Sequence, residues 1–155
     1  MSRAFVKEPD GAEAFEDLPG KLISEHANLV TPEGLALIEA EVARLQSDLG
    51  VAQAGKERAD IARASRDLRY WSERRRSAEV MPAPDRHGLV QFGSTVTIER
   101  GGGRKQVYRI VGEDEANPAK GTLSYVSPLA QALMGKGVGE VVHAGNSDAE
   151  ILTIG

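Results

Sequence analysis

Cysteine is absent from the 155-residue chain. Its absence excludes disulfides, thiolate zinc sites and cysteine nucleophiles, and it suits a protein of the reducing cytoplasm. The three histidines stand at positions 26, 87 and 143, which is too scattered for a metal-binding motif. Aromatic residues are also scarce, at 5% of the chain. We therefore expect neither cysteine chemistry nor a metal site in this protein.

Long apolar runs are missing as well. No stretch approaches the ~18 consecutive apolar residues of a membrane-spanning helix, and the first residues, MSRAFVKEPDGAEAF, lack the apolar core of a signal peptide. A chain of 155 residues fits one domain or two small ones and falls short of a TIM barrel, which needs ~250 residues. We expect a small, soluble, cytoplasmic protein that makes no membrane contact.

The net charge of −4 is unevenly distributed along the chain. Residues 1–30 and 31–55 each carry −3, residues 56–79 carry +3, and residues 80–155 are nearly balanced. An acidic segment followed by a basic one favours two elements that lie side by side. Two solvated helix faces without a functional role would produce the same pattern.

A helical pattern begins at Thr31, which is a favourable N-cap, and Pro32 suits the first helical position. Apolar residues then recur in alternating steps of three and four, as in a coiled coil. They are Leu35, Ile38, Val42, Leu45, Leu49 and Ala52. Gly50 and Gly55 bracket a weak stretch, so we expect the first helix to end near Gly50. Such an arm of about 18 residues reaches ~27 Å.

A second helix is expected to start near Lys56, with the same spacing of inward positions. These positions are Ile61, Ala64, Leu68, Trp71, Arg75 and Ala78. Pro82 and Pro84 end the helix, because proline cannot continue the hydrogen-bond ladder. Two such helices joined by a short glycine-containing turn predict an antiparallel hairpin. One long helix is the alternative, but two glycines at ~1 kcal/mol each disfavour it.

Beyond Leu89 the pattern becomes that of strands, rich in β-branched residues and interrupted by turn signals such as Gly101-Gly102-Gly103. The expected strands cover 90–99, 104–111, 122–126, 140–143 and 150–154. One short helix is expected from Pro128 to Met134, capped by Ser127 and followed by Gly135. The acidic segment 112–118 is expected to be a loop.

The predicted fold class is therefore α+β, a helical hairpin followed by an antiparallel sheet that carries one short helix. We predict three parts. Residues 1–30 form an acidic, partly disordered N-terminal tail, residues 31–80 form the antiparallel coiled-coil hairpin, and residues 81–155 form the sheet domain.

Four segments of the sequence resemble motifs of the Gre transcription elongation factors, in the order in which that family carries them. They are the TPEG segment at 31–34, the FGSTV segment at 92–96, YRIVGEDEA at 108–116 and SPLAQALMGK at 127–136. Agreement at all four is specific, and it spans most of the chain beyond residue 30.

The resemblance implies a C-terminal domain of FKBP-like fold that docks on bacterial RNA polymerase, and a coiled coil that enters the secondary channel of the polymerase. Candidate polymerase contacts lie in the matched loops and around the short helix. They are Asp114, Glu115, Ser127, Pro128, Met134 and Lys136. A turn role for the two acids and a helix-capping role for Ser127-Pro128 are alternative readings of the same residues.

The resemblance further implies a role for acids at the hairpin tip. In the family these acids help to hold a Mg²⁺ in the polymerase active site, so that the polymerase cleaves backtracked RNA. Carboxylates suit this task because Mg²⁺ prefers oxygen ligands. Here the tip retains Glu57 and Asp60 as candidate acids, but Ala54 and Arg58 replace a family Asp and Asn. Each arm is also shorter than a standard Gre arm by roughly three turns, or ~16 Å.

These departures predict a monomeric regulator of transcription elongation that binds RNA polymerase without efficient transcript cleavage. Any cleavage would be carried out by the polymerase, so no enzymatic activity and no cofactor of its own are expected, with Mg²⁺ at most shared. Nucleic acid, including DNA, would be contacted only within the polymerase complex. The alternatives are a true transcript-cleavage factor, an FKBP-type prolyl isomerase and a direct DNA-binding protein, which the net charge of −4 disfavours.

Overall fold

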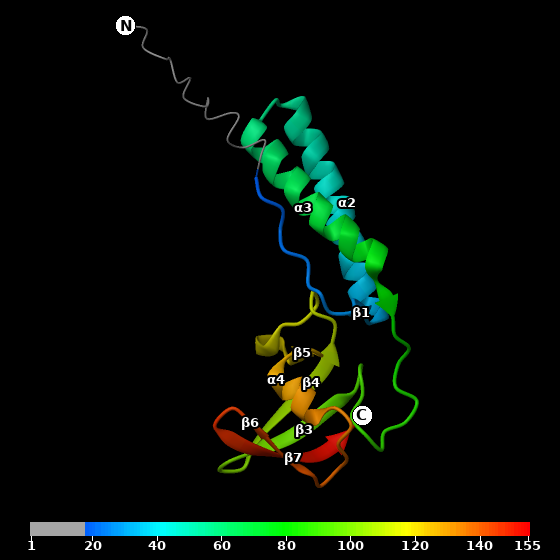
Figure 1. The fold of residues 1–155 in the computed structure, drawn as a ribbon, viewed down its shortest axis with the longest axis vertical. Helices are drawn as coiled ribbons and strands as arrows, with labels where there is room; N and C mark the ends of the chain where they lie inside the picture. The colour runs from blue at the N-terminus through cyan, green and yellow to red at the C-terminus, as the bar shows by residue number, and fades with distance from the viewer. Residues whose placement is uncertain (1–17) are drawn as a thin grey trace, which may run out of the picture. The chain divides into compact units, whose positions relative to one another are not determined.

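The computed structural model describes residues 18–155, and Figure 1 labels most of its helices and strands. The described chain forms two compact units. The hairpin unit comprises residues 18–24 and 38–76, and the sheet unit comprises residues 25–37 and 77–155. No helix of the described part is long and apolar enough to cross a membrane.

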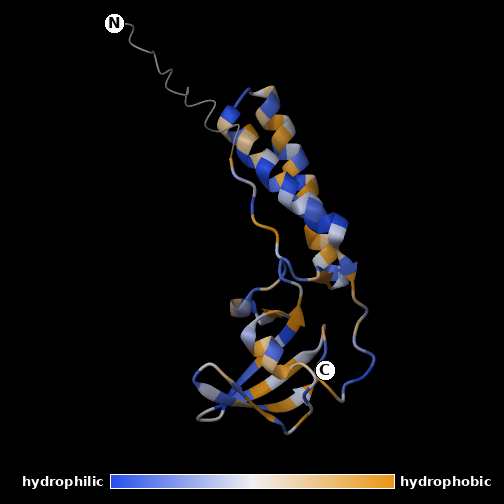
Figure 2. Ribbon diagram, viewed as in Figure 1, coloured by the Kyte–Doolittle hydropathy of each residue, from blue (hydrophilic) through white to orange (hydrophobic). Residues whose placement is uncertain are grey.

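Two helices build the hairpin: α2 covers Pro32–Ala54 and α3 covers Arg58–Ser77. The apolar positions that the spacing predicts for α2 form its buried face, since Ile38, Val42 and Leu45 are at most 3% exposed. From α3, Ala64 is buried. The rest of α3 is strongly hydrophilic, with seven arginines, and Figure 2 shows this contrast between the helices. The hairpin thus has a narrow apolar contact and wide polar faces.

The first helix is longer than the sequence predicts. It continues through Gly50 to Ala54, so α2 has 23 residues and a length of ~35 Å. The weak stretch stays helical because the burial of Ala52, which is 6% exposed, offsets the ~1 kcal/mol that Gly50 costs within a helix. Only Gly55, Lys56 and Glu57 connect the two helices.

The inward positions of α3 also differ near its C-terminal end. The sequence places Arg75 among them, but Arg75 is exposed, whereas its neighbour Arg74 is 1% exposed. Residues 72–77 contain no apolar side chain, so the periodicity that guides the prediction no longer marks the buried face there.

A five-stranded sheet forms the body of the sheet unit. Its strands are β3 (Thr95–Arg100), β4 (Arg104–Val111), β5 (Thr122–Ser124), β6 (Val141–Ala144) and β7 (Ser147–Ile154), in the order β5-β4-β3-β7-β6. Inward side chains of the strands, with Leu133 and Ala130 of α4 (Pro128–Leu133), make the core. The α+β fold class predicted from the sequence is confirmed.

The sequence predicts a wholly antiparallel sheet, and this prediction is wrong, because the sheet is mixed. β5 pairs with β4 in parallel. The connection over residues 112–121, which includes the short 3-10 helix η1 (Pro118–Lys120), returns the chain to the end where β4 began, and this return makes a parallel pairing possible. The first predicted strand is also shorter, because residues 90–94 form a turn in which Gly93 has a φ of 86°.

Two further strands, β1 (Leu29–Val30) and β2 (Glu79–Val80), pair in parallel. Leu29 and Val30 fall within the predicted N-terminal tail, and a two-residue strand is too short to show periodicity in the sequence. The first turn of α2 and residues 77–80 belong to the sheet unit, so the units divide at 37/38 and 76/77. Residues 1–17 of the predicted tail lie outside the described residues.

Candidate functional site

The hairpin tip is built by a defined helix-ending motif. The N–H of Glu57 donates to the C=O of Ala52 at 3.0 Å, and the N–H of Lys56 donates to the C=O of Gln53 at 3.2 Å. This hydrogen-bond pair is the Schellman motif, in which the residue at the position of Lys56 takes left-handed backbone angles. Lys56 does so, with a φ of 53°, although glycine is preferred there. Gly55 lies one residue before the position that requires the left-handed backbone angles, so it cannot take the place of Lys56 in the motif.

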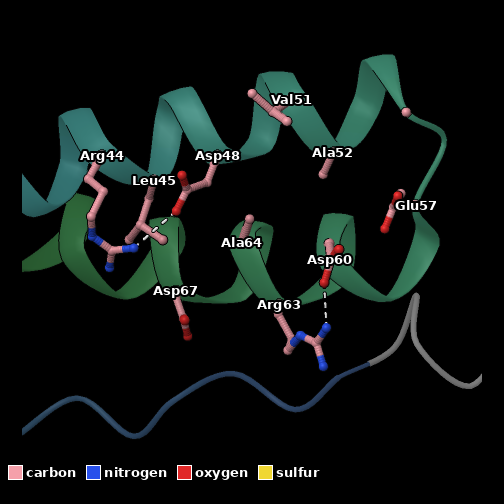
Figure 3. Close-up of a pocket in the computed structure, with 11 residues that line it drawn as sticks. Arg44, Leu45, Asp48, Val51, Ala52, Glu57, Asp60, Arg63, Ala64 and Asp67 are labelled. Carbon is pink, nitrogen blue, oxygen red and sulfur yellow. Dashed lines mark hydrogen bonds and ion pairs between the residues drawn. The ribbon is translucent and has the colours of Figure 1, made fainter.

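Both candidate tip acids lie at the start of α3. Glu57 immediately precedes the helix, is exposed, and its C=O accepts from the N–H of Ile61 at 2.9 Å. Asp60 lies in the first turn and forms an ion pair with Arg63 (Figure 3). The hydrogen bond from Arg63, followed by one involving Glu57, lowers the pKa of Asp60. The structure thus brings the two acids together but engages Asp60 with a cation.

The sequence analysis did not predict that Arg63 would pair with Asp60 and so compete with a metal ion for its carboxylate. The sequence points to Lys56 and Arg58 as the positive neighbours of the tip acids, whereas Arg63 is the residue that holds Asp60. The signal was present, because residues three apart on a helix face each other.

A groove of about 570 Å³ runs between the helices beside the tip. Leu45, Ala52 and Ala64 form its apolar floor, and charged residues stand along its sides (Figure 3). Arg44 is paired with Asp48 at 3.0 Å, as Asp60 is with Arg63. No group of three or more His, Cys, Asp or Glu side chains within residues 18–155 is arranged to hold a metal ion.

Four of the candidate polymerase contacts gather around α4. The Ser127 hydroxyl caps this helix by accepting from the N–H of Ala130, and exposed Pro128 occupies the first helical position. Met134 is the C-cap and packs against the core, while Lys136 is exposed just beyond it. Pro128 and Lys136 are therefore the two of these residues with side chains at the surface.

Glu115 has a structural task in the sheet unit. Its carboxylate accepts from the N–H of Thr31 at 3.2 Å and from the Thr31 hydroxyl at 2.5 Å. The Thr31 hydroxyl in turn accepts from the N–H of Gly34 at 3.0 Å. In an ordinary capping box a Glu at the position of Gly34 would bind the N–H of Thr31. Here that carboxylate comes from residue 115, and a Cβ on Gly34 would collide with it.

A second close approach lies beside this cap. A Cβ on Gly112 would collide with the C=O of Leu29, so the chain at β1 passes directly over Gly112. The segments at 31–34 and 108–116 are far apart in sequence, and their contact explains why both carry a glycine. Asp114, the other candidate of this loop, is half-buried.

Comparison with known proteins connects this architecture to a family. A family model described as the C-terminal part of transcription elongation factor GreA/GreB matches residues 85–154. The transcription elongation factor GreA of Helicobacter hepaticus is 36% identical over 149 aligned positions, which cover 86% of this chain and 87% of that protein. This chain belongs to the Gre family of transcription elongation factors. The capped start of α2 and the α4 region are thus the places where this Gre protein carries the TPEG and SPLAQALMGK segments.

Two further comparisons are more limited. GreA of Nautilia profundicola is 51% identical over 69 residues, which are 44% of this chain and 43% of that protein. Among solved structures, GreA factor homolog 1 of Thermus thermophilus matches with a TM-score of 0.42 and 21% identity, over 84% of this chain and 99% of that chain.

Proposed function

We propose that this Gre-family protein binds bacterial RNA polymerase, places its hairpin in the secondary channel, and modulates elongation without efficient transcript cleavage. Membership of the family supports the polymerase as partner. The chain would act as a monomer, would need no cofactor of its own, and would meet nucleic acid only inside the polymerase complex. Any residual RNA cleavage would be carried out by the active site of the polymerase.

The engagement of Asp60 by Arg63 is the observation that carries the proposal for weak cleavage. A carboxylate that already accepts from a guanidinium binds Mg²⁺ less readily, because the metal must first displace the arginine. Arg58 and Lys56 add positive charge on either side of Glu57. Ala54 stands at the aligned position of the first family acid, an Asp, and its side chain has no oxygen ligand to offer.

The proposal also includes a hairpin shorter than a standard Gre arm, and the 23 residues of α2 make that arm longer than the 18 residues predicted from the sequence. The connection between the helices has only three residues, so no loop extends the arm beyond the ends of α2 and α3. A shorter arm that is docked at the same rim stops further from the catalytic Mg²⁺.

Cleavage is tested with purified, backtracked elongation complexes. The unmodified protein is expected to slow or redirect elongation while releasing short 3′ RNA fragments no faster than the polymerase alone. The double variant Ala54→Asp/Arg58→Asn restores the family residues at the tip. A rise in cleavage would attribute the weak cleavage to the tip residues, and no rise would attribute it to the length of the arm. Rapid fragment release by the unmodified protein, lost in Glu57→Ala, would overturn the proposal and establish a true cleavage factor.

Binding is tested directly with purified core polymerase. Lys136→Ala and Pro128→Ala, at the exposed ends of α4, are expected to weaken binding, whereas the control Lys105→Ala, on exposed β4, is expected to leave it unchanged. Failure of the unmodified protein to bind the polymerase would refute the partner.

A prolyl isomerase is not favoured, because Phe92 and Tyr125 pack on each other at 5.7 Å and Tyr108 packs on the core.

A further inference from the structure

An extended segment, Leu18–Ser24, lies along the outer face of α3 and belongs to the same compact unit as the hairpin (Figure 1). Lys21 holds it in place. Its ammonium group lies 2.9 Å from a carboxylate oxygen of Asp67 and 5.7 Å from the centre of the Tyr70 ring. An ion pair and a cation–π contact at one side chain fix the register of the segment on the helix.

The segment runs parallel to α3. Lys21 contacts α3 at positions 67 and 70, whereas Leu18, three residues earlier in the chain, lines a groove with residues that begin at Arg58. The chain before Leu18 therefore leaves the described structure at the end of α3 that lies next to the hairpin tip.

The groove at this exit has a volume of about 270 Å³ and combines a small apolar floor with two arginines. Ile61 and Ala62 are half-buried in its floor, and Arg58 and Arg69 are exposed. Neither arginine has an ion-pair partner among the residues that the structure describes. Arg58 also lies in the first helical turn, where a cation is opposed by the helix dipole. The groove thus favours an anionic occupant with a few apolar side chains.

The chain itself supplies such an occupant. Residues 8–17, EPDGAEAFED, carry five acids and no basic residue, and Phe15 and two alanines lie among them. They are joined covalently to Leu18, so their effective concentration at the groove is in the millimolar range. Even a weak contact is then extensively formed, although each exposed ion pair contributes little.

We propose that the acidic segment 8–17 of this chain binds the groove on α3 formed by Leu18, Arg58, Ile61, Ala62, Ser65 and Arg69. The inference rests on the pinned segment and on charge, and it is independent of the proposed function in transcription.

Paramagnetic relaxation tests the proposal in the full chain, which has no native cysteine to interfere with labelling. A nitroxide on Ala12→Cys is expected to broaden the amide signals of Arg58 to Arg69 more than those of α2. Two variants are expected to abolish this broadening: Arg58→Gln/Arg69→Gln, and a chain in which the five acids are replaced by their amides. A matched control, Arg75→Gln/Arg104→Gln, removes two exposed arginines elsewhere and is expected to leave the broadening intact.

Two results would overturn the proposal. One is equal broadening of all helix signals, or none on α3, in the labelled but otherwise unmodified chain. The other is broadening of isotope-enriched, unlabelled chains by added spin-labelled ones at the same strength, which would assign the groove to the segment of a second copy. High salt is expected to weaken the intramolecular contact, because it screens exposed charges.

Discussion

At the scale of single residues, Lys56 takes a left-handed conformation that a side chain disfavours. Replacement by glycine removes this cost, and we expect Lys56→Gly to stabilise the protein by about 1 kcal/mol. Urea unfolding followed by circular dichroism measures the change. Lys56→Ala is the control, because it removes the same charge but keeps the Cβ. An equal gain in both variants would assign the effect to charge and contradict the conformational explanation.

Two glycines of α2 lead to opposite expectations for the same substitution. Gly50→Ala places a Cβ in open space within the helix, so we expect a gain of about 1 kcal/mol. Gly34→Ala directs a Cβ onto the Glu115 carboxylate, which two hydrogen bonds to Thr31 hold in place. We expect that variant to lose about 1–2 kcal/mol, as a broken cap does.

The same unfolding experiment includes a double variant that identifies the cause. In a Glu115→Ala background the collision is absent, so Gly34→Ala should cost less than it does alone. Additive effects of the two substitutions would contradict the tertiary capping of α2 by Glu115.

At the scale of elements, α3 depends on carboxylates that are paired with arginine or lysine. The hydrogen bond from Arg76 lowers the pKa of Glu73, and that from Arg63 lowers the pKa of Asp60. Burial raises the pKa of Asp67, but the hydrogen bonds and charges of Lys21 and Arg66 together outweigh burial, and the net pKa is lowered. A lowered folded-state pKa stabilises the fold above the unfolded-state value, and the stabilisation is lost as the pH falls through the folded-state value.

We therefore expect the hairpin to lose stability as the pH falls below about 4. Helical circular dichroism at increasing urea, compared at neutral pH and at pH 3, measures this loss. The variant Asp60→Asn/Asp67→Asn/Glu73→Gln lacks the three titrating groups and should show a flatter pH dependence. If the stability of that variant depended on pH as steeply as that of the unmodified protein, groups other than these three would cause the loss of stability at low pH.

At the scale of the whole molecule, the two units differ in how much apolar surface they bury. Ten buried residues make the core of the sheet unit, whereas the hairpin relies on a few, chiefly Ile38, Val42, Leu45, Ala52 and Ala64. Regions with few buried apolar contacts open locally at lower free energy. We expect amides of β3, β4 and β7 to exchange hydrogen most slowly, and those of residues 58–70 considerably faster. Uniform protection across both units would contradict this expectation.

Much of this organisation could be predicted from local pattern. The Thr31-Pro32 and Ser127-Pro128 helix starts, the coiled-coil spacing of α2 and the α+β class are confirmed, since each depends on residues close in sequence. The end of α2, the burial of Arg74 in place of Arg75, and strand β1 were not predicted correctly. Glycine propensity and apolar periodicity are weak there, and packing decided the outcome.

The candidate sites divide in the same way. The sequence alone determined that Glu57 and Asp60 lie at a hairpin tip and that Ser127, Pro128, Met134 and Lys136 surround one short helix, because turns and caps are local. Only the tertiary structure decided that Glu115 caps α2 and that Lys21 pins a segment on α3. It likewise decided that β5 runs parallel to β4. These contacts join residues tens of positions apart, and no local preference encodes which distant group will fill the space that a glycine leaves open.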